Sequence, residues 1–149
     1  MILKEDSSEQ KLRGAYYTPL KLAKKMVDFF KDDLSIKSIL EPSCGDGVFV
    51  DALLESQFLS QHKRVTAIEI EKKEAEKLSE KLKDNSNIDV VNGDFFEFYH
   101  KHKDMDTYDL ILGNPPYIRY QYLEEKQRSE MAEILTSHGM KANKLINTW

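Results

Sequence analysis

The chain has 149 residues, of which 40% are hydrophobic and 32% charged, a composition that fits one globular domain with its own core. Its polar first ten residues lack a signal-peptide core, and no apolar run reaches the ~18 residues of a membrane span, so we expect a cytoplasmic protein. The single cysteine excludes an internal disulfide and a cysteine-rich zinc site, and we predict no metal site. A net charge of −4 argues against a free-standing DNA-binding domain.

Strands and helices are predicted to alternate along the chain. After a flexible segment over 1–13, Thr18 is expected as the N-cap and Pro19 as the first residue of a helix. The apolar residues Leu22, Met26, Phe29 and Phe30 follow at helical spacing. In chain order, the predicted elements are a helix over 20–31, a strand over 36–41, a helix over 48–56, a strand over 64–69, a helix over 71–83, a strand over 88–91, a short helical segment over 95–99 and a strand over 108–112. The aromatic residues Phe96, Phe98 and Tyr99 are assigned to the core, and the histidines at 100 and 102 to a solvated turn.

This alternation predicts right-handed crossovers and a Rossmann-like, doubly wound parallel sheet with helices on both faces. Residues 118–149 lack a strand and hold one weak helical pattern over 123–135 and the start of another helix near Lys144. We therefore expect a sheet truncated after about four strands, with an incomplete core domain over 14–117.

A glycine turn follows the first predicted strand, in the run Glu41-Pro42-Ser43-Cys44-Gly45-Asp46-Gly47. The two glycines permit a tight turn and a close backbone approach to a ligand at the start of the next helix. The run matches neither GxGxxG nor a phosphate-binding GKS or GKT, which disfavours nucleotide phosphates. Acidic side chains at 41, 46 and 51 would suit a cationic ligand, and a purely structural turn is the alternative.

Two further motifs follow the second and third predicted strands. Glu69 stands about 20 residues beyond the glycine turn, where nucleotide-binding α/β folds hold ribose hydroxyls, and Ile70 would then lie against an adenine ring. Asp94 would accept a hydrogen bond from the adenine amino group, with Phe95 covering the ring. A solvated strand-end glutamate and a turn followed by a core aromatic are the alternatives.

The most specific motif is Gly113-Asn114-Pro115-Pro116-Tyr117, directly after the fourth predicted strand. The two prolines fix the backbone and keep Asn114 out of the helical region. Asn114 and the Pro115 carbonyl offer two acceptors for the two hydrogens of an –NH2 group, and Tyr117 offers a ring on which a base can stack. Because the first and fourth strands are neighbours in a doubly wound sheet, this loop should meet the glycine turn at one crevice.

Together with Gly14-Ala15-Tyr16-Tyr17-Thr18-Pro19, these motifs resemble those of the adenine-N6 DNA methyltransferases of restriction–modification systems, in the gamma-class order, over residues 13–120. The resemblance implies the class I fold and S-adenosylmethionine as cofactor. It assigns Tyr17, Thr18 and Pro19 to the methionine end of the cofactor. Glu41, Cys44, Gly45, Asp46 and Gly47 would form the floor of the pocket. Glu69 would hold the ribose, and Ile70, Asp94 and Phe95 the adenine.

The same resemblance makes Asn114, Pro115, Pro116 and Tyr117 the loop that binds a flipped-out adenine of DNA. The family's recognition domain, through which DNA would be read, is missing from this chain, so we expect the fragment alone to be inactive. A restriction subunit or a fused nuclease would accompany the family's enzymes, and the oligomeric state stays open. Alternative acceptors are a protein glutamine amide and an RNA base amine, an inactive cofactor-binding fragment is a further alternative, and an NAD dehydrogenase fits the glycine pattern least.

Overall fold

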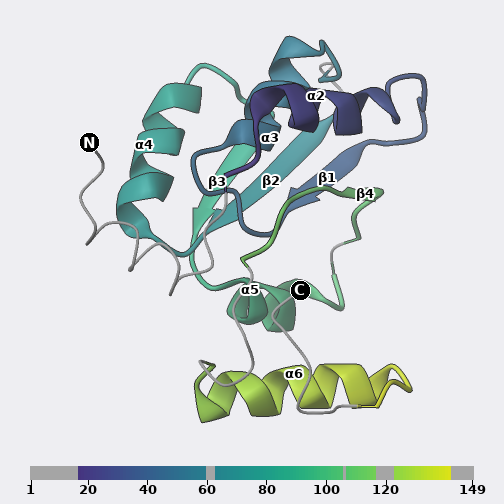
Figure 1. Cartoon of the computed structure of the whole chain (residues 1–149), viewed down its shortest axis with the longest axis vertical. Helices are drawn as coiled ribbons and strands as arrows, with labels where there is room; N and C mark the ends of the chain where they lie inside the picture. Colours follow the sequence, from purple (N-terminus) through teal and green to yellow (C-terminus); the bar gives the residue numbers. More distant parts are fainter. Residues whose placement is uncertain (1–16, 60–62, 106, 117–122, 142–149) are drawn as a thin grey trace. The chain divides into compact units, whose positions relative to one another are not determined.

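The structure of the chain is a computed structural model that describes residues 17–59, 63–105, 107–116 and 123–141. Residues 17–114 form one compact unit, and the remaining described residues, 115–116 and 123–141, belong to a second. Figure 1 shows the helices and strands with the labels used below.

The first unit contains a four-stranded sheet in which all neighbouring strands are parallel. In chain order the strands are β1 (Ser38–Glu41), β2 (Arg64–Glu69), β3 (Ile88–Asn92) and β4 (Leu110–Ile111), and their order in the sheet is β3-β2-β1-β4. The last residue of β1 pairs with Ala67, and the last residues of β2 and β3, Glu69 and Asn92, pair with each other. The predicted doubly wound topology is confirmed, including the pairing of the first strand with the fourth.

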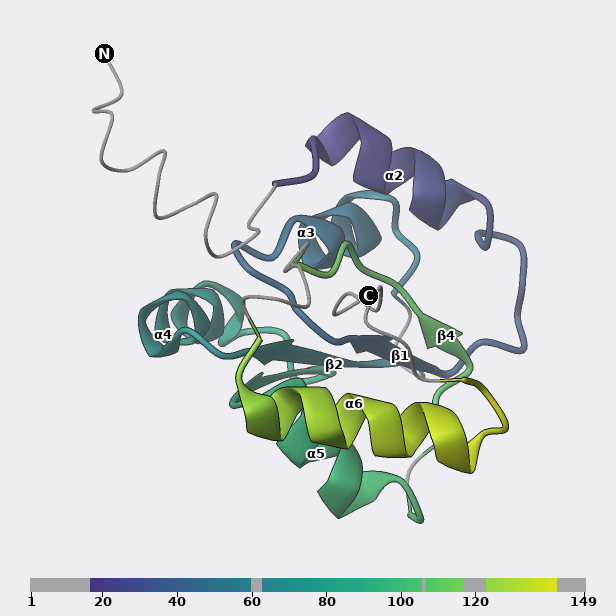
Figure 2. The ribbon, with the colours of Figure 1, turned by 60° about the horizontal axis from the view of Figure 1, so that its bottom comes forward.

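Helices cover both faces of this sheet. The helices are α2 (Leu20–Asp28), α3 (Val48–Glu55), α4 (Lys72–Leu82) and α5 (Phe95–His102). α3 and α4 connect strands that progress in one direction across the sheet, whereas α5 returns from β3 to β4, so right-handed crossovers place α5 on the opposite face. Figure 2 shows α2 and α3 on one side of the sheet and α5 on the other.

The core lies between the sheet and the helices that follow β1 and β2. The predicted inner faces of α3 and α4 are confirmed, because Phe49, Ala52, Leu53, Ala75, Leu78 and Leu82 are buried. The apolar residues that predicted α2 pack only in part. Ala23 and Val27 are the buried residues of α2, and Met26 and Phe30 pack half-buried against the core. Leu22 is 51% exposed, and Phe29, just past the helix, is 84% exposed. Small side chains allow α2 to pack closely against α3.

The aromatic helix α5 also departs from the prediction. It is three residues longer than expected, and none of its residues is buried, so Phe96, Phe98 and Tyr99 are not core residues. The two histidines lie in its last turn rather than in a loop. The ring of His102 stacks on Phe98 at 4.1 Å, and its Nδ1 lies 2.8 Å from the Phe98 carbonyl oxygen. Stacking between these half-buried rings stabilises the helix locally.

The second unit contributes one described helix, α6 (Glu125–Ser137), where a weak helical pattern was expected over 123–135. It begins with a capping box in which Glu124 and Gln127 satisfy each other's backbone N–H groups. The helix predicted to begin at Lys144 lies outside the described residues. Among the described helices of both units, none is long and apolar enough to cross a membrane.

Candidate functional site

The predicted site residues of the first unit gather at the carboxyl ends of the four strands. Glu41 and Glu69 are the last residues of β1 and β2, Asp94 lies two residues beyond β3, and Asn114 lies three residues beyond β4. In an open parallel sheet these ends form the ligand-binding edge, and the β1–β4 pair is the point at which strand order reverses.

The glycine turn between β1 and α3 is held by backbone hydrogen bonds and needs glycine at two places. Gly45 and Gly47 adopt φ angles of +54° and +81°, which disfavour any side chain. At Gly47 an added Cβ would also collide with the side chain of Leu78 on α4. The N–H of Cys44 donates to the Ile68 carbonyl at 2.8 Å, tying the turn to β2. The Cys44 thiol is buried, and this burial raises its pKa, so it stays protonated.

Glu69 holds the glycine turn from the next strand. Its Oε2 accepts a hydrogen bond from the Gly45 N–H at 2.7 Å, and its Oε1 accepts one from the Glu71 N–H at 2.8 Å. The side chain is only 8% exposed. Each carboxylate oxygen has two lone-pair directions, so both oxygens retain acceptor capacity beyond these bonds.

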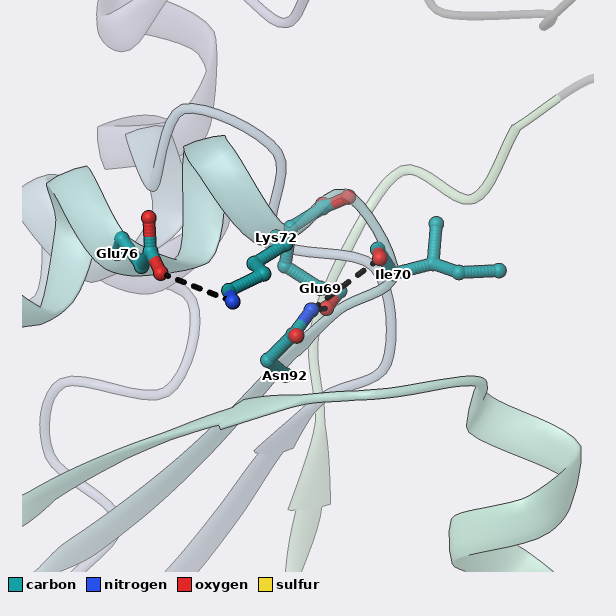
Figure 3. Close-up of polar contacts among 5 residues, drawn as sticks. All are labelled: Glu69, Ile70, Lys72, Glu76 and Asn92. Atoms are coloured by element: carbon teal, nitrogen blue, oxygen red, sulfur yellow. Dashed lines mark hydrogen bonds and ion pairs between the residues drawn. The ribbon is translucent and has the colours of Figure 1, made fainter.

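Asn92 fixes the backbone of this region. Its Nδ2 donates to the carbonyls of Glu69 at 2.8 Å and Ile70 at 3.2 Å, and the N–H of Gly93 donates to the same Glu69 carbonyl. Figure 3 shows the contacts of Asn92, with the Ile70 side chain extending away from them. Asn92 opens the predicted motif Asn92-Gly93-Asp94-Phe95, but no role was predicted for its side chain. An asparagine at a strand end before glycine is typical of a side chain that bonds to nearby backbone.

Glu41 is the most unusual carboxyl group of the turn. It is 2% exposed, and among the described residues its Oε2 has no hydrogen-bond partner. Burial raises the pKa of this carboxyl well above its usual range, and the nearby acidic groups of Asp46, Asp51 and Glu69 raise it further. An orphan carboxyl of this kind is costly to fold unless something else satisfies it. The hydroxyl of Ser43, two residues further along the chain, is also buried and has no hydrogen-bond partner among the described residues.

The other acidic side chains of the turn have different environments. Asp51, on α3, pairs with Lys81 of α4 at 2.5 and 2.7 Å, so its charge is already balanced by a cation of the chain. Asp46 is exposed. Glu41 and Glu69 are therefore the two buried carboxyl groups at this edge of the sheet.

The residues expected around an adenine ring occupy the ends of β2 and β3. Asp94 caps α5, because its Oδ1 accepts hydrogen bonds from the N–H groups of Phe96 at 2.8 Å and Glu97 at 3.1 Å. Phe95 is half-buried, and Ile70 is 63% exposed. A large apolar side chain exposed beside a buried carboxylate is available to a flat apolar ligand.

The segment before α2 also reaches this edge. A Cβ built at Gly45 would lie 3.8 Å from Cε1 of Tyr17, so the Tyr17 ring covers the glycine turn. The expectation that Thr18 caps α2 is wrong, because the N-cap is Pro19 and no side chain caps this end. The Thr18 hydroxyl instead accepts a hydrogen bond from Nδ2 of Asn114 at 3.2 Å.

The loop after β4 lies against the glycine turn, as the sequence predicts. A Cβ at Gly113 would be 3.4 Å from Cδ of Pro42 and 3.8 Å from Cγ of Glu41. Asn114 closes this unit of the chain, and the next residues, Pro115 and Pro116, are half-buried. Tyr117, the predicted stacking ring, lies outside the described residues.

Asp109, for which no role was predicted, forms hydrogen bonds at the opposite end of the β1–β4 strand pair. Its carboxylate accepts hydrogen bonds from the N–H groups of Lys37 at 2.8 Å and Ser38 at 2.9 Å, and from the Ser38 hydroxyl at 3.0 Å. These bonds lower its pKa. They anchor the start of β4 to the start of β1 and so position the loop that leaves the other end of β4.

The sequence comparisons give the family. Residues 14–146 match the Eco57I restriction-modification methylase family. The chain belongs to this family. It is 32% identical over 128 residues to the type II methyltransferase M.HincII of Haemophilus influenzae, which covers 86% of this chain and 22% of that protein. It is 28% identical over 134 residues to the type II methyltransferase M.AccI of Acinetobacter calcoaceticus, and this alignment covers 90% of this chain and 23% of that protein. The chain thus spans about a fifth of the length of these curated relatives.

Solved methyltransferase structures share the fold of this family member. The methyltransferase subunit of the type I restriction-modification system of Streptococcus thermophilus aligns with a TM-score of 0.56 at 17% identity, over 75% of this chain and 26% of that one. The O-methyltransferase of Bacillus cereus in complex with SAH gives the same TM-score at 17% identity, and this alignment covers 74% of this chain and 50% of that one. At these identities the likeness describes the α/β fold, with its four parallel strands.

Proposed function

We propose that this chain is the cofactor-binding and amine-binding part of a DNA methyltransferase that transfers a methyl group from S-adenosylmethionine to N6 of adenine. The observation that carries the proposal is the close approach of Gly113 to Pro42 and Glu41, which an added Cβ at Gly113 would touch. This approach sets the start of the Asn-Pro-Pro-Tyr loop against the glycine turn. A cofactor seated on the turn and an amine bound by the loop would then be neighbours. Family membership supports methyl transfer within a restriction–modification system.

The residues of the turn suit the charge of this cofactor. S-adenosylmethionine is a sulfonium with an ammonium group. The buried Glu41 carboxyl has one oxygen without a hydrogen-bond partner in the described part of the chain, and a cationic donor would pair with it. Gly45 and Gly47 keep the backbone bare of side chains on the approach to it. Tyr17 and Pro19, with Cys44 and Asp46 of the turn, would enclose the methionine end.

The nucleoside end would lie along the ends of β2 and β3. Glu69 would accept hydrogen bonds from the ribose diol on the lone pairs that its two backbone donors leave available. Asp94 uses Oδ1 to cap α5 and would direct Oδ2 to the adenine amino group. Ile70 and Phe95 supply apolar surface for the two faces of the ring.

The Asn-Pro-Pro-Tyr loop would prepare the amine. When bound, S-adenosylmethionine supplies an already activated methyl group, so the chemical difficulty lies in an N6 lone pair delocalised into the purine. Asn114 Oδ1 and the Pro115 carbonyl would accept the two N6 hydrogens, which favours a tetrahedral nitrogen with its lone pair in line with the methyl. The N–C bond forms as the S–C bond breaks, and one N6 proton then leaves to water. Pro116 keeps the loop rigid, and Tyr117 would stack on the flipped base.

The DNA itself would be read by other parts of a longer enzyme. The chain's net charge of −4 provides little attraction for phosphates, and its curated relatives are about four times its length. We therefore propose that the chain alone binds cofactor without methylating DNA, and that the complete enzyme adds a recognition region.

The test is methylation of duplex DNA by the complete enzyme with radiolabelled S-adenosylmethionine, followed by nucleoside analysis. The expected product is N6-methyladenine, and Asn114→Ala should lower the single-turnover rate by about 10²–10³, by analogy with loss of one oxyanion-hole group. Label in cytosine, in RNA or in a protein glutamine, or full activity of Asn114→Ala, would overturn the proposal.

A further inference from the structure

The Thr18 hydroxyl has a partner that a helix-start residue would not be expected to have. It stands one residue before the N-cap Pro19 and makes no capping bond, although threonine at a helix start is normally read as a cap. Its Oγ1 instead accepts from Nδ2 of Asn114, a residue 96 positions away at the end of the same compact unit. The hydroxyl therefore joins the entry to α2 to the exit from β4.

The backbone of Asn114 is constrained from both sides, whereas its side-chain amide can be offered in either of two orientations. The following Pro115 restricts the backbone of Asn114 to extended conformations. On the other side, Gly113 lies against Pro42 and Glu41. An asparagine amide is nearly symmetric in shape, but one end is an acceptor and the other a donor, so a half turn about the last side-chain bond reverses its chemistry.

Only one of these two orientations is compatible with an amine acceptor. With Nδ2 bonded to Thr18, Oδ1 points to the other side of the amide carbon. In the reversed orientation the donor Nδ2 would meet the hydrogens of an –NH2 group, which is a repulsive arrangement. In the orientation that the structure shows, the Thr18 hydroxyl accepts from Nδ2, whereas a methyl group of the same size could form no hydrogen bond with either end of the amide.

We propose that Thr18 is a positioning residue whose hydroxyl sets the Asn114 amide so that its oxygen is the end offered to the substrate amine. This inference rests on the proposed function and adds a residue that acts through Asn114 rather than through the cofactor. It assigns a purpose to the threonine that differs from the contact with the methionine end implied by the family resemblance.

The test compares Thr18→Val and Thr18→Ala, which remove the hydroxyl, with Thr18→Ser, which keeps it. Each complete enzyme is measured for single-turnover methylation at saturating DNA and cofactor, and for the dissociation constant of S-adenosylmethionine by calorimetry. Loss of one oriented hydrogen bond should slow methyl transfer about fivefold to tenfold in both hydroxyl-free variants. Thr18→Ser should retain the wild-type rate within about twofold, and cofactor affinity should stay unchanged in all three.

A double-mutant comparison separates positioning from a general structural role. If Thr18 acts through Asn114, then adding Thr18→Val to an Asn114→Ala enzyme should not lower the single-turnover rate any further. Wild-type rates in Thr18→Val, a weakened cofactor affinity at normal rate, failure of serine to rescue, or additive losses with Asn114→Ala would each overturn the inference. Absence of methylation by the wild-type enzyme would instead contradict the proposed function.

Discussion

The carboxylate of Glu69 and the backbone N–H of Gly45 are joined by a hydrogen bond of 2.7 Å across 24 residues of sequence. The side chain at the end of β2 therefore shapes the glycine turn that follows β1, before any ligand is considered. The same carboxylate accepts from the Glu71 N–H and so bridges the turn to the start of α4. A single buried acidic residue thus organises two loops of the proposed cofactor site.

Replacing Glu41 by glutamine should change how stability depends on pH. Burial raises the pKa of the folded Glu41 carboxyl well above its ordinary value of 4.5, so the folded chain holds a proton that the unfolded chain has released. As pH rises from 4.5 through the folded pKa, the free energy of unfolding should fall by up to about 1.4 kcal/mol per pH unit. Urea unfolding of Glu41→Gln should lack this part of the slope. Glu76→Gln, an exposed control, should keep it, and equal slopes in all three proteins would contradict the burial of an uncompensated carboxyl.

Binding of the cofactor should release a proton from the same group. Pairing with a cationic ligand lowers the pKa of a buried carboxyl, so the affinity for S-adenosylmethionine should increase with pH below the folded pKa. Calorimetric titration in two buffers of different ionisation enthalpy measures the protons released. Release by wild type that persists unchanged in Glu41→Gln would show that another group is responsible.

Gly47→Ala should be strongly destabilising. The φ angle of +81° strains an alanine, and its Cβ would collide with Leu78. We expect a loss of about 2–4 kcal/mol in the free energy of unfolding. Gly93→Ala is the matched control, because nothing lies within 4 Å of a Cβ there, and it should change stability by less than about 0.5 kcal/mol. Similar losses in the two variants would contradict the close packing of the turn on α4.

Asp109→Asn should lower the melting temperature at neutral pH and have no effect in strong acid. The N–H groups of Lys37 and Ser38 and the Ser38 hydroxyl hold the pKa of Asp109 below its ordinary value of 3.8. A carboxylate whose folded pKa is depressed stabilises the fold above its unfolded pKa, and this contribution is lost as pH falls through the folded value. Thermal melts at pH 7 and pH 2.5 measure the difference. Asp89→Asn, at an exposed position of β3, is the control and should leave the melting temperature unchanged.

The order of strands and helices was predictable because it depends on local patterns. Alternating apolar strands and amphipathic helices predicted the parallel sheet, and the inner stripes of α3 and α4 were read from three- and four-residue spacing. The packed side of α2 could not be predicted in this way, because apolar residues occur on more than one side of the helix. The side that packs on α3 is the one whose small residues, Ala23 and Val27, allow a close approach.

Roles that depend on distant partners could not be read from the sequence. A threonine before a proline predicts a helix cap. The Thr18 hydroxyl instead accepts a hydrogen bond from Asn114, a residue that only the fold brings close. The aromatic residues of α5 resemble a core stripe, yet none is buried. The motifs at 41–47, 69 and 113–114 could be expected to lie together because parallel strands end at one edge of the sheet. The hydrogen bond between Glu69 and Gly45, in contrast, is visible only in the structure.

The most direct test of the account is calorimetric titration of this chain with S-adenosylmethionine, comparing wild type with Glu69→Ala and Glu76→Ala. The two glutamates lie seven positions apart, but Glu69 holds the glycine turn, whereas the exposed Glu76 pairs with Lys72 of α4 at 3.7 Å. Figure 3 shows this ion pair. The account predicts one saturable site in wild type and in Glu76→Ala, with affinity lowered at least about tenfold in Glu69→Ala by loss of hydrogen bonds to a charged acceptor. Equal affinity in Glu69→Ala, or no binding by wild type, would contradict a cofactor site at the ends of β1 and β2.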